Sequence, residues 1–345
     1  MADIRGLDAL DREVIQRGLC AACGACVSRC PYLVKFKGKT VKLDQCTVEK
    51  GRCYAYCPMT FFDESSASEA FLGVPHDETE LGYSLEIVAS RATSSDIAAS
   101  GQGGGTVTSL LLTAMERGFI DAAVLTTALG ENGFPRGIVA TTPAEITACA
   151  GSKFVGAHTL TALKEALDRG FNRIGVVAVP CQVRSVRKMA LYDLKSENLR
   201  DRLSLVIGLF CNWAFSARDF VSTLTKILGD RKVLKADIPP PPANMLNLET
   251  EAGIENIPLD ELRPIIQAAC QYCPDMTSEF ADVSVGMYEG RPGWNTLIVR
   301  SEVGRRLVEA AVAEKRIETD VFPETNLGHL KQASLNKKRR LADNG

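Results

Sequence analysis

The sequence predicts an α/β fold (α+β overall), in which a mixed, mostly parallel sheet with flanking helices follows a small cysteine-rich module. Two observations lead to this expectation. Between about residues 100 and 315, short apolar segments of strand type alternate with segments of helical apolar spacing, as in strands joined by helical crossovers. In addition, seven of the 12 cysteines fall within the first 57 residues, where little room remains for regular elements.

The composition is that of a protein with a sizeable core. The 345 residues are 46% hydrophobic, which suffices for two or more folded units. The net charge of −2 gives no reason to expect nucleic acid or an anionic membrane as a partner. The N-terminal segment lacks the apolar core of a signal peptide, and no apolar run approaches the about 20 residues that cross a bilayer. We therefore expect a cytoplasmic protein without direct membrane insertion, which reaches a membrane only through a partner.

Changes in composition divide the chain into four parts. We expect a cysteine-rich module over residues 1–62, an acidic connector over 63–95, a main domain over 96–320 and a basic tail over 321–345.

The main domain begins with a helix and a strand. Thr106 to Arg117 has helical apolar spacing and ends at Gly118. Ala122 to Thr127 is a continuous apolar run, as in a strand that is buried on both faces.

Two more helices and a strand follow. Thr142, Pro143 and Glu145 provide an N-cap, a first-turn proline and a capping-box partner. Leu160 to Leu167 has helical spacing and stops shortly before a glycine. Ile174 to Val179 is then the next strand.

The last third of the chain continues the alternation. We expect a strand over Leu203 to Phe210, a helix from Ser216 to Gly229 and a late amphipathic helix over Arg305 to Val312. Pro239 to Pro242 can continue neither a helix nor a central strand, so an extended surface crossover is preferred over a proline-rich recognition motif. The basic run Lys337 to Arg340 indicates a mobile, solvated tail, and docking to an acidic partner is the alternative.

The first cysteine run has the spacing of a bacterial ferredoxin, C-x2-C-x2-C-x3-C-P, and ends at Pro31. Two-residue gaps let one short loop surround a cubane, and Gly24 permits close approach of the backbone. A zinc ion bound by the same cysteines is the alternative. In two-cluster ferredoxins the fourth cysteine of each run serves the other cluster. The first cluster is therefore expected on Cys20, Cys23, Cys26 and Cys57.

The second cysteine run is degenerate. It keeps the terminal Cys53-x3-Cys57-Pro58 but lacks the central C-x2-C spacing, so one ligand is missing. Cys30, Cys46 and Cys53 are left to hold a second 4Fe-4S cluster with a further ligand, or a 3Fe-4S cluster, or none.

Five cysteines lie in the main domain. Cys181 and Cys211 each follow a predicted strand, so both are expected at the carboxyl edge of the sheet, where open α/β sheets bind ligands. Cys270 and Cys273 form a local pair that could complete a third cluster. The alternative is that the strand-end thiols are small buried hydrophobes. Cys149, among small residues in a predicted helix, is expected in the core.

A glycine-rich loop, Ser100 to Thr108, leads into the first helix of the main domain. Its backbone N–H groups and the positive end of the helix dipole could face a phosphate. The loop matches neither a Walker A motif nor a dinucleotide fingerprint, and a tight structural turn is the alternative. Ser152 and Lys153 add a hydroxyl and a cation that could contact a phosphate or flavin. His76, His158 and His329 show no metal or triad spacing and are expected to be structural.

Together these stretches resemble the beta subunits of coenzyme F420 hydrogenases and dehydrogenases. The resemblance covers residues 100 to 300, in the family's order, and rests on SGQGGGTVTSLLLTAMERGFIDAAV, GSKFVGAHTLTALKEAL, VVAVPCQV, IGLFC, CQYCPDMTSEFADVSVG and GWNTLIVR. The N-terminal module resembles the ferredoxin-like extension of longer family members, except for its incomplete second run.

The resemblance implies a flavoprotein of the electron-transfer class. It implies that residues 96–320 bind FAD, exchange a hydride with reduced F420 or a related donor, and pass single electrons to iron–sulfur clusters. The residues that look like the family's FAD-contacting region are Gly103, Gly104, Gly105, Thr106, Ser152 and Lys153. Those that look like its cluster ligands are Cys181, Cys211, Cys270 and Cys273.

A flavin is the natural converter here, because a hydride delivers two electrons and a cluster accepts one. We therefore expect FAD, two to three 4Fe-4S clusters, other redox subunits of a hetero-oligomeric complex, and F420, ferredoxin or NAD(P)H as the diffusible carrier. No acid–base residue of the protein is required, so the catalytic residues remain unknown. A self-contained reductase of an organic substrate and a non-enzymatic redox-sensing module are the alternatives.

Overall fold

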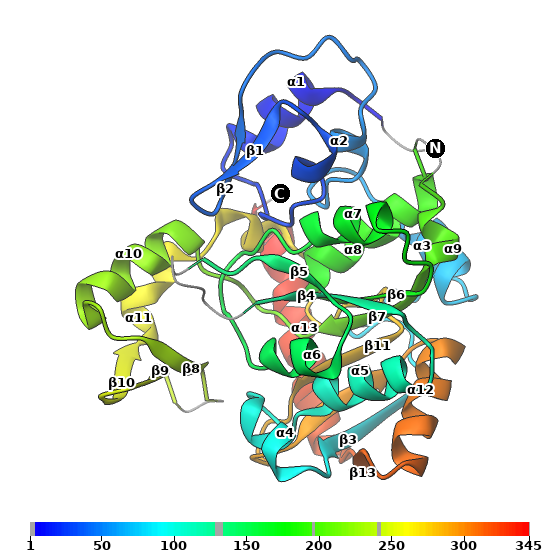
Figure 1. Cartoon of the computed structure of the whole chain (residues 1–345), viewed down its shortest axis with the longest axis vertical. Helices are drawn as coiled ribbons and strands as arrows, with labels where there is room; N and C mark the ends of the chain where they lie inside the picture. Colours follow the sequence, from blue (N-terminus) through cyan, green and yellow to red (C-terminus); the bar gives the residue numbers. More distant parts are fainter. Residues whose placement is uncertain (1–3, 128–133, 195–196, 240–242, 345) are drawn as a thin grey trace.

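The computed structural model describes residues 4–127, 134–194, 197–239 and 243–344. Its centre is a large sheet with helices on both faces, and the cysteine-rich module lies at one end of the molecule (Figure 1). The expected α/β architecture is confirmed.

Eight strands form the large sheet. Their order across it is β13 (Ile317–Val321), β3 (Glu86–Ala92), β12 (Asn295–Val299), β11 (Val283–Met287), β7 (Leu203–Leu209), β6 (Ile174–Ala178), β4 (Ala122–Thr126) and β5 (Gly137–Ala140). The central neighbours β11, β7, β6 and β4 pair in parallel, and the remaining pairs are antiparallel. The sheet is thus mixed as expected. Its parallel part occupies the centre, and β12 follows β11 through a short connection, as antiparallel neighbours can.

The central strands are buried on both faces. In β4, Ala122 and Val124 belong to one core, whereas Ala123 and Leu125 belong to the other. Such strands read as continuous apolar runs, and this is why the sequence revealed them. Each fully buried leucine or valine contributes about 1.5–3 kcal/mol relative to an exposed one.

Helices cover both faces of this sheet. One face carries α4 (Ser95–Ser100), α5 (Thr106–Glu116), α6 (Pro143–Ala148) and α12 (Glu302–Ala313). The other carries α3 (Glu64–Phe71), α7 (Thr161–Asp168), α8 (Pro180–Tyr192) and α9 (Leu199–Arg202). The predicted capping box of α6 is confirmed, because Thr142 accepts from the N–H of Glu145 and Glu145 accepts from the N–H of Thr142.

A smaller unit lies beside the sheet, and of its elements only the helix from Ser216 to Gly229 was predicted. It comprises α10 (Ala217–Leu228), β8 (Val233–Asp237), β9 (Met245–Thr250), β10 (Gly253–Pro258), α11 (Leu259–Leu262) and η3 (Arg263–Ile265). Phe220, Leu246 and Leu248 form its own core. The crossover expected at Pro239 to Pro242 connects β8 to β9 and lies, except for Pro239, outside the described residues.

The cysteine-rich module has few and short elements. They are α1 (Leu7–Leu10), η1 (Asp11–Ile15), η2 (Val27–Arg29), β1 (Leu33–Phe36), β2 (Lys39–Lys42) and α2 (Arg52–Ala55). The module packs on α7 and α8: Leu160 N–H donates to the Cys23 carbonyl at 3.0 Å, and Ser185 Oγ donates to the Tyr56 carbonyl at 2.7 Å. Gly24 has a φ of +89°, and a Cβ there would lie 2.9 Å from the backbone of His158. Glycine is therefore required for docking at this point.

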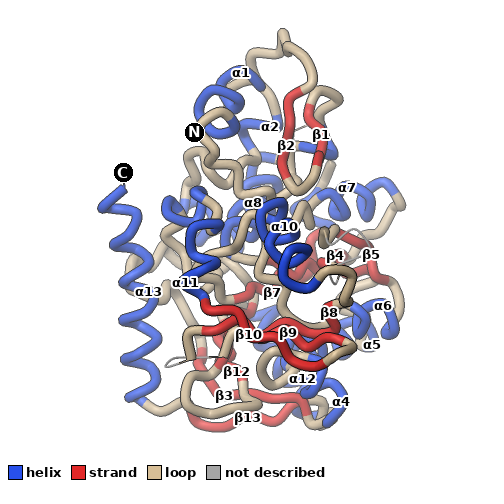
Figure 2. The backbone as a smooth tube through the Cα atoms, turned by 90° about the vertical axis from the view of Figure 1, so that its left-hand side faces the viewer, coloured by secondary structure: helices blue, strands red, loops and turns tan. Residues whose placement is uncertain are grey.

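Two of the four expected parts of the chain differ in the structure. The connector over 63–95 was expected to lie between domains, yet β3 is an inner strand of the large sheet. The tail over 321–345 was expected to be mobile, yet it forms α13 (Glu324–Asn344), which packs against η4 (Ala268–Tyr272). Figure 2 shows α13 as a long helix along one side of the molecule. It is held by polar contacts, such as Ser334 Oγ to the Glu80 carbonyl at 2.6 Å, which leave no apolar pattern in the sequence.

Candidate functional site

Four cysteines come together at the carboxyl end of the parallel strands. Cys181 lies in the first turn of α8, directly after β6, and Cys211 follows β7. Cys270 lies in η4, and Cys273 follows it. Burial, and then the neighbouring Cys273 and Cys211, raise the pKa of Cys181 well above its ordinary value. We call these four residues the strand-end group.

The donors in the strand-end group fit an iron–sulfur cluster. Burial raises the pKa of Cys211 to about 12, against the opposing charge of Lys337. Buried thiols of this kind do not ionise alone, but coordination to a metal deprotonates them. The Ala214 N–H points at Cys270 Sγ from 3.3 Å, and hydrogen bonds to sulfur are among the means by which proteins adjust clusters. The four ligands supply sulfur only, as a 4Fe-4S cluster requires.

The cysteine-rich module contains a second set of four thiols, which we call the first N-terminal group: Cys20, Cys23, Cys26 and Cys57. Burial, and then Cys23, Cys20 and Cys57 in that order, raise the pKa of Cys26 well above its ordinary value. The structure thus brings together the four cysteines that the ferredoxin spacing assigned to one cluster.

The remaining three thiols of the module form the second N-terminal group: Cys30, Cys46 and Cys53. Burial raises the pKa of Cys53 to about 11, and Cys30 and Cys46 add to the rise. The twelfth cysteine, Cys149, caps the C-terminus of α6 and packs on the opposite core, so it is not a fourth ligand.

The described residues contain no three His, Cys, Asp or Glu side chains close enough to share a single metal ion. The three groups are defined by which cysteines neighbour one another, and which metal centres they hold stays a prediction.

The three groups are neighbours of one another. Cys23 of the first N-terminal group is among the thiols that raise the pKa of Cys181 in the strand-end group. Cys53 of the second N-terminal group likewise raises the pKa of Cys26 in the first. Cysteines of both N-terminal groups also pack in one cluster with Tyr272, which lies between Cys270 and Cys273 of the strand-end group, so the three groups are neighbours.

The glycine-rich loop contacts Asn295 of β12. The N–H groups of Gly104 and Thr106 donate to Asn295 Oδ1 at 2.8 and 3.3 Å. A Cβ on Gly103 would lie 2.4 Å from Asn295 Nδ2, and Gly105 adopts a φ of +74°. Close packing therefore accounts for these glycines, and two of the N–H groups considered for a phosphate already have a partner in the protein.

The second segment expected to contact the flavin lies beside this loop. Ser152 Oγ donates to Gln102 Oε1, which joins the two segments. Lys153 Nζ donates to the carbonyls of Ala150 and Gly151, each at 2.7 Å, and burial lowers the pKa of Lys153 to about 8. The structure brings the segments together, and whether they contact FAD stays a prediction.

Four residues of this region were not predicted as site residues: Gln102, Lys188, Asn295 and Lys337. Asn295 lies in a strand-like run, and the two lysines lie in polar helices. Only tertiary packing brings these side chains to the loop and to the cysteine groups, so no spacing in the sequence could have identified them.

Two of the three histidines expected to be structural have structural contacts. His158 is buried, its Nε2 lies 3.0 Å from Thr40 Oγ1, and burial lowers its pKa to about 4. His76 stacks on Phe280 with 5.7 Å between ring centroids.

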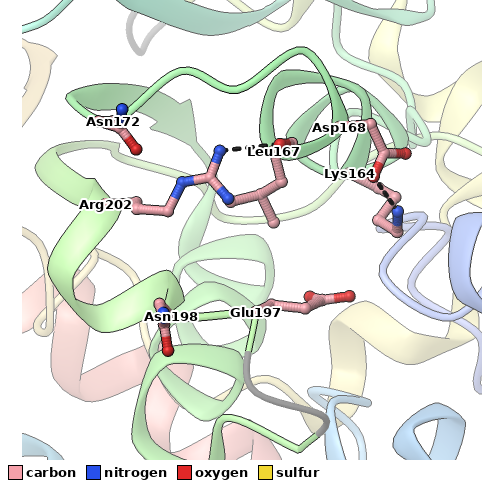
Figure 3. A pocket seen from close by; sticks show the side chains of 7 residues that line it. All are labelled: Lys164, Leu167, Asp168, Asn172, Glu197, Asn198 and Arg202. Carbon is pink, nitrogen blue, oxygen red and sulfur yellow. Dashed lines mark hydrogen bonds and ion pairs between the residues drawn. The ribbon is translucent and has the colours of Figure 1, made fainter.

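A surface cavity lies away from the cysteines. It measures about 400 Å³ and is lined by Lys164, Leu167, Asp168, Asn172, Glu197, Asn198 and Arg202 (Figure 3). These residues lie where β6 and β7 begin, opposite the edge where Cys181 and Cys211 follow the strands. Arg202 there donates to the Leu167 carbonyl at 2.8 Å, as helix-capping side chains do. We assign no chemistry to this cavity.

None of the helices that the structure describes is long and apolar enough to cross a membrane.

Comparison with known proteins gives two family-model matches, which together cover most of the chain. Residues 87–164 match the N-terminal part of the coenzyme F420 hydrogenase/dehydrogenase beta subunit, and residues 171–325 match its C-terminal part. Neither match includes the cysteine-rich module.

Individual relatives agree with these models. The coenzyme F420 hydrogenase subunit beta of Methanothermobacter thermautotrophicus is 32% identical over 76% of this chain and 95% of its own length. A subunit of the F(420)H(2) dehydrogenase of Methanosarcina mazei is 29% identical over 91% of this chain and 88% of its own length. A chain of the F420-reducing [NiFe] hydrogenase complex from Methanosarcina barkeri superposes with a TM-score of 0.71 at 27% identity, covering 79% of this chain and 94% of that one.

Proposed function

The chain belongs to the coenzyme F420 hydrogenase/dehydrogenase beta-subunit family, and on this premise we propose that it carries electrons between F420 and a partner redox subunit by way of FAD and iron–sulfur clusters. The family makes it an oxidoreductase subunit that works with redox partners and with F420 as carrier. The flavin, the clusters and the route between them are our proposal.

One observation carries the proposal: the adjacency of the three cysteine groups. The strand-end group belongs to the flavin-binding part that the family predicts, and Cys23 is its neighbour from the module. Both N-terminal groups share one packed cluster, and several of their cysteines, Cys46 among them, are partly exposed. The groups therefore offer a route from the main domain to the surface of the module.

The chain's own residues have three tasks in this proposal. The segments joined by Ser152 and Gln102 would hold FAD, which when bound supplies the conversion of a hydride into two single electrons. The cysteines hold iron as thiolates. The packing of Leu160 and Ser185 on the module keeps the strand-end and first N-terminal groups together.

Anaerobic mixing tests the proposal. The purified protein is quantified for flavin, iron and sulfide, and then mixed with reduced F420, NADH or reduced ferredoxin while flavin bleaching is followed. We expect bleaching by reduced F420 and, on addition of a partner acceptor, its reversal. No bleaching by reduced F420 would overturn F420 as the donor, and turnover of an organic substrate by the isolated chain would favour a self-contained reductase. Iron and sulfide without flavin would indicate a sensing module.

A further inference from the structure

A buried lysine of the C-terminal helix lies at the strand-end group. Lys337 of α13 is 2% exposed. Its Nζ donates to the carbonyl of Cys211 at 2.5 Å. Lys337 was expected in a solvated basic run, but its side chain points into the protein next to a proposed cluster ligand.

Lys337 is a cation in this place. The side chain is held by the Cys211 carbonyl, and thiolates on iron nearby would favour the charged form of a lysine. Within the described part of the chain, no carboxylate lies within ion-pair distance of Lys337 Nζ. A buried ammonium is costly without negative charge nearby, and thiolates that hold a cluster would supply that charge.

The same arrangement occurs a second time, at the first N-terminal group. Lys188 of α8 is 1% exposed, and its Nζ donates to the carbonyl of Cys57 at 2.7 Å. Each of the two four-cysteine groups thus has a buried lysine that contacts the carbonyl of a ligand cysteine. Lys337 lies on α13 and Lys188 lies on α8.

We infer that Lys337 raises the reduction potential of the cluster held by the strand-end group. This inference rests on the proposed function, because it requires that cluster. Reduction adds one negative charge to the cluster, and a fixed buried cation nearby stabilises the reduced form more than the oxidised form. α13 would then set how readily the first cluster after the flavin accepts an electron.

The test compares the wild-type protein with Lys337→Met, which keeps most of the length of the side chain and removes its charge. Lys337→Arg retains the charge, and Lys331→Gln removes an exposed charge from the same helix as the matched control. Midpoint potentials are measured by redox titration with electron paramagnetic resonance, after Cys273→Ser has identified the strand-end signal.

For Lys337→Met we expect at least a tenfold drop in the equilibrium constant of reduction, which is about 59 mV toward more negative potential for a one-electron couple. Lys337→Arg should restore most of the potential, and Lys331→Gln should leave it unchanged, because exposed charges are screened. The midpoint potentials of the clusters in the cysteine-rich module should stay unchanged.

An unshifted strand-end potential in Lys337→Met, with iron and sulfide at wild-type levels, would overturn this inference and leave the proposed function intact. If this variant loses iron, Lys337→Gln is titrated instead. Loss of the same cluster from both neutral variants would assign Lys337 to holding the loop of Cys211, which contradicts a role in setting the potential. Absence of any signal sensitive to Cys273→Ser in the wild type would instead overturn the proposed function.

Discussion

Docking of the cysteine-rich module depends on one carboxylate that contacts two arginines. Glu197 of the main domain accepts from Arg29 Nε at 3.1 Å and from Arg52 Nη1 at 2.8 Å. The side chain of Arg29 is 1% exposed, so it depends on Glu197 for charge compensation. We predict that Glu197→Gln loosens the module.

The free-energy cost of Glu197→Gln follows from the burial of the ion pair. Removing one partner of a buried ion pair costs about 3–5 kcal/mol, because the other charge is left uncompensated. Since Arg52 and Glu197 are partly exposed, at 19% and 14%, the lower end applies, and we expect about 3 kcal/mol. This corresponds to about a hundredfold increase in the population with an undocked module.

Hydrogen exchange measures this population. In Glu197→Gln the N–H of Leu160, which donates to the Cys23 carbonyl, should exchange about a hundredfold faster. Amides in the core strands β7 and β11 should keep their protection. Glu69→Gln, which removes an exposed charge on α3, is the matched control. A change below about threefold at Leu160, or equal acceleration throughout the protein, would refute the reasoning.

Two further predictions concern the loop and the buried histidine. Asn295→Ala leaves the N–H groups of Gly104 and Thr106 without their acceptor, at a cost of about 1–3 kcal/mol, and should weaken FAD binding at least tenfold in a fluorescence titration. Unchanged FAD affinity would remove the loop from the flavin site. Burial lowers the pKa of His158 to about 4, so the unfolded state binds more protons between about pH 6.5 and 4, and stability is lost as the pH falls through this window. His158→Gln should therefore gain about 2–3 kcal/mol relative to the wild type between pH 7 and 4.5 in urea unfolding, and a constant difference would contradict a buried neutral His158.

The sequence predicted the elements whose signal is local. Ala122 to Thr126 and Ile174 to Ala178 are apolar on both faces, and Thr142 begins a complete capping box. The grouping of Cys181 with Cys211 also followed, because parallel strands end at one edge of their sheet.

The elements that were missed are held by long-range contacts. β3 lies between β12 and β13, and its partners are more than 200 residues away in sequence. α13 buries Ser334 and Lys337, which are polar, so its packed face has no apolar period. Lys337 and Asn295 were not predicted for the same reason, since only packing gives these residues their neighbours.

The central claim is that electrons pass from the main domain to the module through the strand-end group, and Cys181→Ser tests it most directly. Rapid mixing with reduced F420 is followed by freezing and electron paramagnetic resonance of the clusters in the module. We expect the flavin of the variant to bleach as in the wild type, while reduction of the module's clusters slows at least tenfold. Reduction of those clusters at the wild-type rate, in a variant that has lost the strand-end signal, would contradict the claim.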